Sequence, residues 1–239
     1  MKMTTINILL LACLFSLQSC EKEELSFDSG DIEFEIKTGE HWLHDFPVFL
    51  GLTKKNPPQF AIWLEDSSGN YISTVFATYK IASESWLANN GNRRKESLPH
   101  WCYQRGIVAE DGLLLPSKAH PLTDGITVAT PKEDKTIKIA TSNLKKPFVI
   151  KAEFNHSVDF NSYYPKNAKE GYDNYSGGAE GRGQPAVIYS ATIYPETKTA
   201  TLQLIGHSSP DGSDGKIYSE IEKLTSAKAI VESIQVTLK

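Results

Sequence analysis

Strict alternation of apolar and polar residues is the feature that most constrains the fold of this chain. Residues 31–37 read Asp-Ile-Glu-Phe-Glu-Ile-Lys, so that every second side chain is apolar. Because side chains on a β-strand point alternately to opposite faces, this pattern is typical of a strand with one face buried and the other in water. Further short segments rich in β-branched and aromatic residues lie at 60–65, 71–76, 136–141, 148–154, 186–194, 200–205 and 230–238. The sequence therefore predicts a chain built mainly of short strands.

The connections between these segments favour an antiparallel sandwich. Residues 66–70 (Asp-Ser-Ser-Gly-Asn) supply turn chemistry inside 60–76, which is expected to form a hairpin. Helical spacing is visible only at 81–89 and 218–228. Many short strands joined by Gly, Pro, Asn and Asp clusters are more typical of sandwiches than of alternating β-α units. We therefore expect an all-β, immunoglobulin-like antiparallel β-sandwich with one or two short helices, as a single domain over residues 30–239.

The N-terminus has the layout of an export signal. A lysine precedes an apolar stretch at 6–17, which is too short for a membrane span of about 20 residues. Leu17-Gln18-Ser19-Cys20 resembles the bacterial lipoprotein lipobox, in which the cysteine is acylated and becomes the first mature residue. The resemblance implies a signal peptide at 1–19, lipidation of Cys20 and a polar tether at 20–29, with an ordinary cleaved signal peptide as the alternative. The protein is then expected at the bacterial cell envelope, lipid-anchored to the outer membrane and facing the periplasm or the surface.

The start of the tether offers one hint about sorting. Residues 21–24 read Glu-Lys-Glu-Glu, and an acidic run directly behind an acylated cysteine resembles the surface-export signal of Bacteroidetes lipoproteins. A solvated linker without sorting information is the equally weighted alternative.

Charge and cysteine content exclude several classes. The formal net charge is −4, with Lys+Arg 25 against Asp+Glu 29 mixed along the chain, so neither a nucleic-acid partner nor a polybasic membrane patch is expected. Membrane contact should come through the lipid alone. Of the three cysteines, Cys13 leaves with the signal and Cys20 is acylated, so Cys102 cannot form an intrachain disulfide. We expect Cys102 to be a small buried hydrophobe rather than a reactive thiol.

Two histidine-containing segments carry residue types that occur in catalytic or metal sites. The run from His207 to Asp211 contains Ser, His and Asp, but adjacency in sequence is not triad geometry, and no Gly-x-Ser-x-Gly occurs. A polar turn is favoured there, and a hydrolase built on His207 and Asp211 is kept as an alternative. His41 and His44 would share a face of a helix, but His-Glu-x-x-His is absent and Pro47 follows closely. Structural histidines are favoured, and no metal is expected.

A long loop at 155–184 is the main candidate for binding. It is rich in Tyr, Gly and Asn, and loops of this length in compact domains tend to be functional or disordered. Its glycine-rich part, 177–183, lacks the Gly-Lys-Ser/Thr ending of a phosphate loop and is expected to be a flexible turn. Exposed tyrosines and arginines make binding surfaces, with loop packing as the alternative. The candidate ligand-binding residues are Tyr163, Tyr164, Tyr172, Tyr175, Arg182 and Trp101, and in a glycan-binding version also Trp42 and Trp86.

The segment 123–131 carries a family resemblance. It reads Thr-Asp-Gly-Ile-Thr-Val-Ala-Thr-Pro and is similar to the Asp-Ala-Val-Ser/Thr-Gly-Ala-Thr-Pro motif of the bacterial periplasmic family called domain of unknown function 2271. This places Asp124, Thr127 and Thr130 in the family motif. Other segments resemble the same family in the same order, at 60–74, 98–101, 184–189 and 204–208. The resemblance covers most of residues 60–238.

The same segment bears on cofactors. Some family members are thought to accompany flavin-dependent redox systems, and the motif is similar to the covalent flavin attachment signal Ser-Gly-Ala-Thr-x-Thr. Here Val128 replaces the glycine and Lys132 stands at the acceptor threonine. An amine cannot form the phosphoester, and valine removes a conformationally permissive glycine. No cofactor is therefore expected, and the structural alternative for the segment is a turn followed by a strand.

These features predict a non-catalytic cell-envelope lipoprotein that binds a partner protein or a small ligand. The family resemblance adds a role as accessory to an envelope redox system. The alternatives are a glycan-binding surface lipoprotein and the hydrolase.

Overall fold

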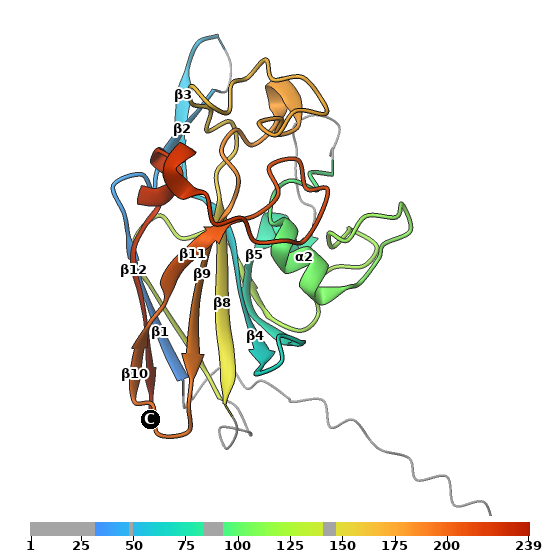
Figure 1. The fold of residues 1–239 in the computed structure, drawn as a ribbon. Coiled ribbons are helices and arrows are strands. Elements are labelled where there is room, and N and C mark those ends of the chain that lie inside the picture. Colours follow the sequence, from blue (N-terminus) through green and yellow to red (C-terminus); the bar gives the residue numbers. More distant parts are fainter. Residues whose placement is uncertain (1–31, 48–49, 84–92, 141–146) are drawn as a thin grey trace, which may run out of the picture.

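Two β-sheets packed face to face form the body of the protein (Figure 1). The structure is a computed structural model, and it describes residues 32–47, 50–83, 93–140 and 147–239. The predicted all-β sandwich is confirmed at this level, while its immunoglobulin-like character stays a prediction. The signal, Cys20 and the tether lie outside the described residues.

The first sheet has four antiparallel strands. Its order is β10 (Thr199–Thr201), β12 (Val231–Leu238), β1 (Ile32–Thr38) and β7 (Lys135–Ile139). The alternation that the sequence shows along β1 is realised in three dimensions, because Ile32, Phe34 and Ile36 are buried while Glu35 is exposed.

The second sheet has six strands. Its order is β11 (Gln203–His207), β9 (Val187–Ile193), β8 (Phe148–Asn155), β4 (Gln59–Asp66), β5 (Tyr71–Thr78) and β6 (Ile126–Val128). The predicted hairpin is present as β4 and β5, which pair antiparallel. The pairing of β6 with β5 is parallel, unlike the others in this sheet. A separate ribbon of β2 (His44–Pro47) and β3 (Thr53–Asn56) lies at the top of Figure 1.

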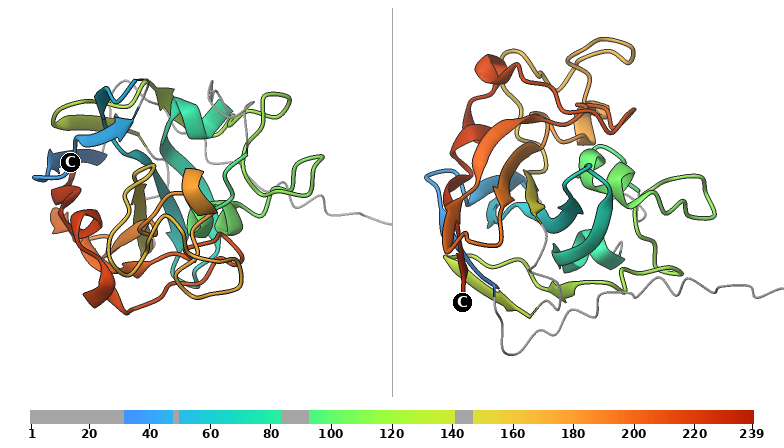
Figure 2. Two further views of the ribbon diagram at one scale, coloured as in Figure 1. Left: turned by 90° about the horizontal axis from the view of Figure 1, so that it is seen from above. Right: turned by 60° about the horizontal axis from the view of Figure 1, so that its bottom comes forward.

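The six-stranded sheet is covered on both faces. Phe60, Ile62 and Leu64 of β4 belong to the core between the two sheets, whereas Ala61 and Trp63 belong to a second core on the other face. This second core lies beneath α2, on the side away from β1 and β12 (Figures 1 and 2). Since both faces are covered, β4 shows a continuous apolar run in place of the alternation seen in β1.

The helices are short. α1 (Tyr79–Ser83) continues directly from β5, so part of the predicted helix at 81–89 is present and the remainder lies outside the described residues. α2 (Pro99–Arg105) begins with a proline and ends at Gly106, whose left-handed φ of 65° lets its N–H bond to the carbonyl of Cys102. None of the helices in the described part of the chain has the length and apolarity needed to cross a membrane.

Three sequence expectations need correction. The helix at 218–228 is wrong, because the chain forms two 3₁₀ turns, η3 (Ile221–Lys223) and η4 (Ser226–Ala229), with Leu224 extended between them. The segment 200–205 is not one strand, because β10 joins one sheet and β11 the other, and the buried Leu202 lies between them.

The third correction concerns the glycine-rich segment, where η2 (Gly178–Glu180) begins a tightly packed turn. A Cβ on Gly181 would lie 1.9 Å from the carbonyl oxygen of Ser176. Gly183 has a φ of +82°, and a Cβ there would lie 2.3 Å from the carbonyl oxygen of Asp159. These glycines therefore serve close backbone packing rather than flexibility.

Candidate functional site

Four segments distant in sequence meet at one end of the six-stranded sheet. β4 and β8 are antiparallel and pair Gln59 with Asn155, so the start of β4 lies beside the end of β8. β5 runs against β4 and β6 runs with β5, so the ends of β5 and β6 reach the same end of the sheet. The chain leaves these strand ends through Lys80, Thr130 and Ser157, which line a common cavity there.

The β2–β3 ribbon supplies another wall. Its register pairs His44 with Asn56 and Phe46 with Lys54. Directly opposite residues on neighbouring strands project from the same face, so these four side chains share one face of the ribbon, and all four line the cavity. Lys55 lies between them in sequence and forms an ion pair with Asp45 at 2.9 Å.

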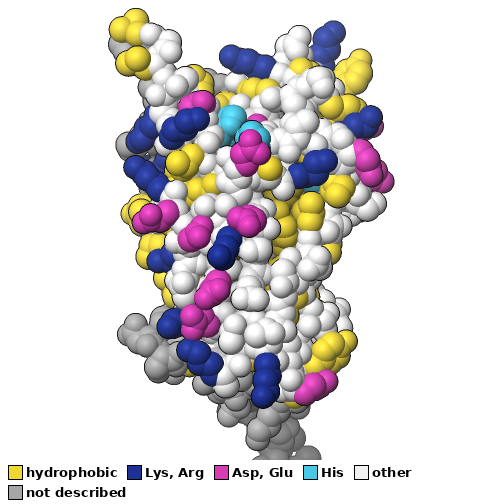
Figure 3. All heavy atoms as spheres, turned by 90° about the vertical axis from the view of Figure 1, so that its left-hand side faces the viewer, with side chains coloured by type: hydrophobic (Ala, Val, Ile, Leu, Met, Phe, Trp, Pro, Cys, Tyr) yellow, Lys and Arg dark blue, Asp and Glu magenta, His cyan; other side chains and the backbone are white. Residues whose placement is uncertain are grey.

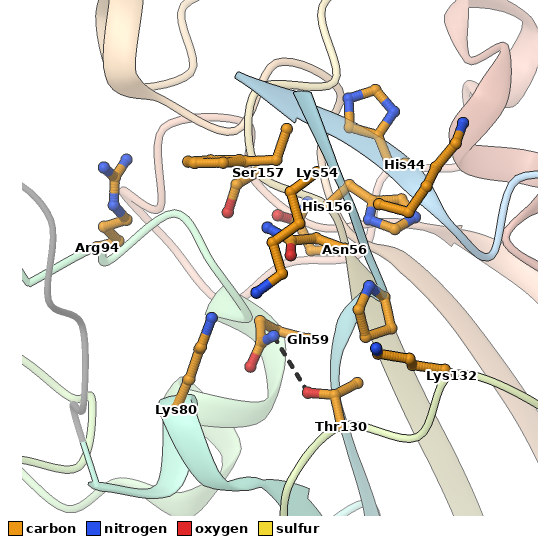
Figure 4. Close-up of a pocket in the computed structure, with 14 residues that line it drawn as sticks. His44, Lys54, Asn56, Gln59, Lys80, Arg94, Thr130, Lys132, His156 and Ser157 are labelled. Atoms are coloured by element: carbon orange, nitrogen blue, oxygen red, sulfur yellow. Dashed lines mark hydrogen bonds between the residues drawn. The ribbon is translucent and has the colours of Figure 1, made fainter. Parts of the chain in front are cut away.

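The cavity has a volume of about 350 Å³ and a strongly basic lining. Five of its lining residues are Lys or Arg and none is Asp or Glu. They are Lys54, Lys55, Lys80, Arg94 and Lys132. Figure 4 shows the amines of Lys54 and Lys80 pointing toward Gln59, with Arg94 and Lys132 on opposite sides. The pKa of Lys80 is lowered by partial burial and by the positive charges of Lys54 and Arg182.

The concentration of positive charge in the cavity does not follow from the composition of the chain. The whole chain carries a formal net charge of −4. On the side of the molecule seen in Figure 3, acidic and basic side chains are intermixed. Carboxylates also stand near the cavity, because Arg94 lies 3.9 Å from Glu96 and His44 lies 3.9 Å from Asp159. Glu96 and Asp159 partly offset the positive charge of the lining, although neither carboxylate lines the cavity itself.

Hydrogen bonds fix the polar groups at the strand ends. Thr78 donates to Oε1 of Gln59 at 2.8 Å, and Nε2 of Gln59 donates to Oγ1 of Thr130 at 3.3 Å (Figure 4). Because Thr130 accepts this bond, its own hydroxyl proton is available to a ligand.

Arg182 holds Ser157 in a similar way. Its guanidinium is fully buried and donates to the hydroxyls of Ser157 and Ser97. Burial lowers the pKa of Arg182 to about 9, with Arg94 acting in the same direction and Glu96 opposing it. The group still carries its charge at neutral pH. Arg182 therefore lies behind the cavity wall and orients Ser157, which lines the cavity.

His156 is neutral at physiological pH. Burial lowers its pKa to about 3, and the neighbouring charges of His44, Arg182 and His41 lower it as well. Its Nε2 lies 2.9 Å from the carbonyl oxygen of His41, so the neutral ring carries its proton on Nε2 and leaves Nδ1 as an acceptor.

The predicted binding residues do not form one surface. Tyr163 and Tyr172 are exposed and Tyr175 is half-buried, but Tyr164, Arg182 and Trp101 are buried. Tyr163 contacts Tyr164 edge to face and has the Lys223 ammonium 5.1 Å from its ring centre. The expectation that this whole set is exposed is therefore wrong, because the loop packs part of it into the interior.

The family-motif residues separate into two roles. Asp124 accepts hydrogen bonds from the Tyr71 hydroxyl and the Thr74 N–H, so it ties the motif to β5. Thr127 lies in β6 beside Ala77. Thr130 is the motif residue that reaches the cavity.

His207 and Asp211, the residues of the alternative hydrolase, each contact groups other than one another. His207 is buried, stacks on Tyr218 with ring centres 5.5 Å apart, and lies 2.8 Å from the carbonyl oxygen of Ser208. Asp211 accepts a hydrogen bond from Ser209 at 2.7 Å, as in a polar turn.

Of the two tryptophans proposed for sugar stacking, Trp42 is not an exposed platform. Trp42 is 2 % exposed and packs against Phe60 and Phe154, so it cannot present its face to a sugar. Trp86 lies outside the described residues. Cys102 is buried, and burial raises its thiol pKa, with the Glu153 charge acting in the same direction.

His44 lies in a strand, so it does not share a helix face with His41. Across the described ranges, no group of three or more His, Cys, Asp or Glu side chains is arranged to hold a metal ion.

Sequence reasoning missed most of the cavity. Its basic residues come from separate segments, and the only local signals are the pairs Lys54-Lys55 and Arg93-Arg94. The sequence sets Lys132 apart only because it stands at the acceptor position of the flavin motif. Single lysines in a chain of mixed charge carry no indication that they converge.

Comparisons with known proteins do not identify the chain. It matches no protein-family model, no curated protein and no solved structure. The resemblance to the family called domain of unknown function 2271 therefore stays a prediction, and the cavity has to be interpreted from its own chemistry.

Proposed function

We propose that this protein is a non-catalytic, cell-envelope binding protein whose cavity takes a small anionic ligand. The observation that carries the proposal is the lining of the cavity, with five Lys or Arg residues and no carboxylate. Bringing like charges together is unfavourable, and an anion relieves this repulsion as it binds.

The other lining groups support the same chemistry. The hydroxyls of Thr130 and Ser157 accept bonds from Gln59 and Arg182, so each has a proton to donate. Donors that are held in place before binding cost less ordering entropy when the ligand arrives. Hydrogen bonds to charged groups contribute about 1.5–3 kcal/mol each, so three of them contribute about 4.5–9 kcal/mol. A millimolar Kd corresponds to about 4 kcal/mol, so weak binding in the millimolar range is the expected scale.

The lipoprotein anchor belongs to the same proposal. Cys20 of the Leu17-Gln18-Ser19-Cys20 segment is the acylated residue, and it holds the binding domain at the envelope. Metabolic labelling with palmitate tests this part: wild-type protein should be labelled and Cys20→Ser should not. Equal labelling of the two would remove the anchor from the proposal.

Anion binding is tested by calorimetry and thermal unfolding with sulfate, phosphate and citrate. A ligand at one hundred times its Kd stabilises the folded state by about 2.7 kcal/mol, which raises Tm by roughly 5–10 °C for a domain of this size. Lys54→Gln combined with Lys132→Gln should weaken binding about tenfold or more, because two of the five cations are lost.

The matched control removes a charge elsewhere. Lys198→Gln changes an exposed lysine in the connection between β9 and β10, outside the cavity lining, and should leave the affinity unchanged. If no anion binds, or if the control weakens binding as much as the cavity variants do, the proposed function is wrong.

A further inference from the structure

We infer that the ligand is an anionic sugar, meaning a small ring that bears both hydroxyl groups and a carboxylate, phosphate or sulfate. This rests on the proposed function and adds the second half of the ligand's chemistry. The inference comes from two adjacent acceptor groups in the wall of a cavity that is rich in donors.

Asn155 supplies the first acceptor. It is 1 % exposed and lines the cavity at the end of β8. Its Nδ2 donates to the carbonyl oxygen of Gln184 at 3.1 Å, which fixes the orientation of the amide. Its Oδ1 is buried and accepts no hydrogen bond from the described residues.

An unsatisfied buried acceptor costs about 1–3 kcal/mol, so such atoms are rare and call for an explanation. A fully ionised sulfate or carboxylate has no proton to give this oxygen. A ligand hydroxyl does, once a small side-chain adjustment uncovers the oxygen. The orphaned acceptor therefore points to an O–H group on the ligand.

His156 supplies a second neutral acceptor in the lining. Its Nε2 proton is engaged with the His41 carbonyl, so the remaining ring nitrogen, Nδ1, accepts rather than donates. His156 adjoins Asn155 in sequence, so both acceptors belong to the segment where β8 ends.

The volume of the cavity and its apolar lining residues also fit an anionic sugar. A volume of about 350 Å³ lies at the small end of the range of ligand pockets, about 300–1,000 Å³, which suits one sugar ring better than a long chain. Phe46 and Pro57 also line the cavity and are partly exposed, so they offer apolar contact to the C–H face of a ring. Lys54, opposite Phe46 on β3, stands next to this contact.

The test compares ligands that share a six-membered ring and one anionic group, of which only the sugar bears hydroxyl groups. Glucuronate and cyclohexanecarboxylate share a six-membered ring and one carboxylate, and only glucuronate can donate to Asn155 and His156. We expect calorimetry on the wild-type protein to show glucuronate binding at least tenfold tighter. Two further pairs vary the anion: glucose 6-phosphate against cyclohexylmethyl phosphate, and glucose 6-sulfate against cyclohexylmethyl sulfate.

A variant locates the effect. Asn155→Leu should weaken binding of the preferred sugar about tenfold and leave the matching hydroxyl-free anion within twofold, because leucine removes the acceptor and spares the lysines. Thr130→Val removes a hydroxyl that can donate to the anion, together with the acceptor of the Gln59 amide, and spares both Asn155 and His156. It should weaken the sugar and the simple anion by the same factor. The wild-type comparison stands even if Asn155→Leu fails to fold.

The outcomes separate the two proposals. A tenfold preference within any pair supports the anionic sugar and identifies its charged group. Equal affinities within all three pairs would overturn the sugar inference and leave anion binding intact. Absence of binding by every anion would overturn the proposed function together with the inference.

Discussion

Glu153 on β8 should make the protein less stable as the pH rises through neutrality. Its carboxyl is fully buried and accepts hydrogen bonds from the N–H groups of Trp101 at 2.8 Å and His100 at 3.3 Å, at the start of α2. Burial raises the pKa of Glu153 from 4.5 to about 8, although these N–H bonds, Ser208 and Lys151 lower it. In the folded protein at pH 7 the group is therefore mostly protonated.

Two buried histidines act in the opposite direction. Burial lowers the pKa of His100 from 6.5 to about 4 and that of His156 from 6.5 to about 3. Between pH 4.5 and 6.5 the unfolded chain binds two protons at the histidines, whereas the folded chain binds one at Glu153, so stability rises with pH. Between pH 6.5 and 8 the unfolded chain loses its histidine protons while the folded state still holds most of its proton at Glu153, so stability falls with pH.

The magnitude follows from these proton differences integrated over the upper window. One full proton changes the free energy of unfolding by about 1.4 kcal/mol per pH unit, so Glu153 by itself costs about 1.7 kcal/mol from pH 6.5 to pH 8. The two unfolded-state histidines, half protonated at pH 6.5, restore about 0.8 kcal/mol, so the net loss is about 0.9 kcal/mol. At a urea slope of about 2 kcal/mol per molar, the unfolding midpoint should fall by about 0.4 M.

Glu153→Gln tests the assignment, because glutamine has a similar size and does not titrate. Its unfolding midpoint in urea should rise by about 0.4 M from pH 6.5 to pH 8, because only the histidines then contribute. An exposed-site control, Glu196→Gln, should lose about as much as the wild type. The reasoning is refuted if wild-type stability is flat or rising over this window, or if Glu153→Gln declines in parallel with it. The first result would mean that the N–H groups at α2 outweigh burial.

Three further predictions concern packing. Gly183→Ala should lower the free energy of unfolding in urea by about 1–3 kcal/mol more than Gly69→Ala does. Both glycines have a φ of +82°, but only at Gly183 would the new Cβ lie 2.3 Å from a backbone carbonyl oxygen. Equal losses for the two variants would refute the close packing. Thr74→Val should cost about 1–3 kcal/mol, because it leaves the buried Trp101 Nε1, which donates to Thr74 at 3.1 Å, without its partner; an unchanged midpoint would contradict this. The Cys102 thiol should react with Ellman's reagent only after denaturation, because it is buried and its pKa is raised, and rapid labelling of the native protein would show that the site opens.

Much of the secondary structure could be predicted because its signals are local. Alternation along residues 31–37 and the turn at 66–70 led directly to β1 and to the β4–β5 hairpin. The errors have non-local causes. The change of sheet at Leu202 depends on which strands β10 and β11 pair with, and nothing in the spacing of 200–205 records it. The spacing at 218–228 suggested a helix, but tertiary packing holds two short 3₁₀ turns there.

The candidate site was less predictable than the fold. Thr130 was singled out through the family motif, and it does reach the cavity. Arg182 was expected to be an exposed contact, yet it acts from the interior by orienting Ser157. The sequence showed that an arginine follows a glycine-rich run, but only the close backbone packing at Gly181 and Gly183 decides that its side chain points inward.

The sequence by itself determined that the chain forms a β-sandwich, because apolar periodicity along a strand states which faces must be buried. Only the tertiary structure decided where function resides. The antiparallel pairing of β4 with β8 and the parallel pairing of β5 with β6 bring strand ends from four parts of the chain together. Charges carried by Lys54, Lys80 and Lys132 lie far apart in sequence and converge on one cavity for that reason. Electrostatic interaction depends on distance in space, so the basic cavity exists only in the folded protein.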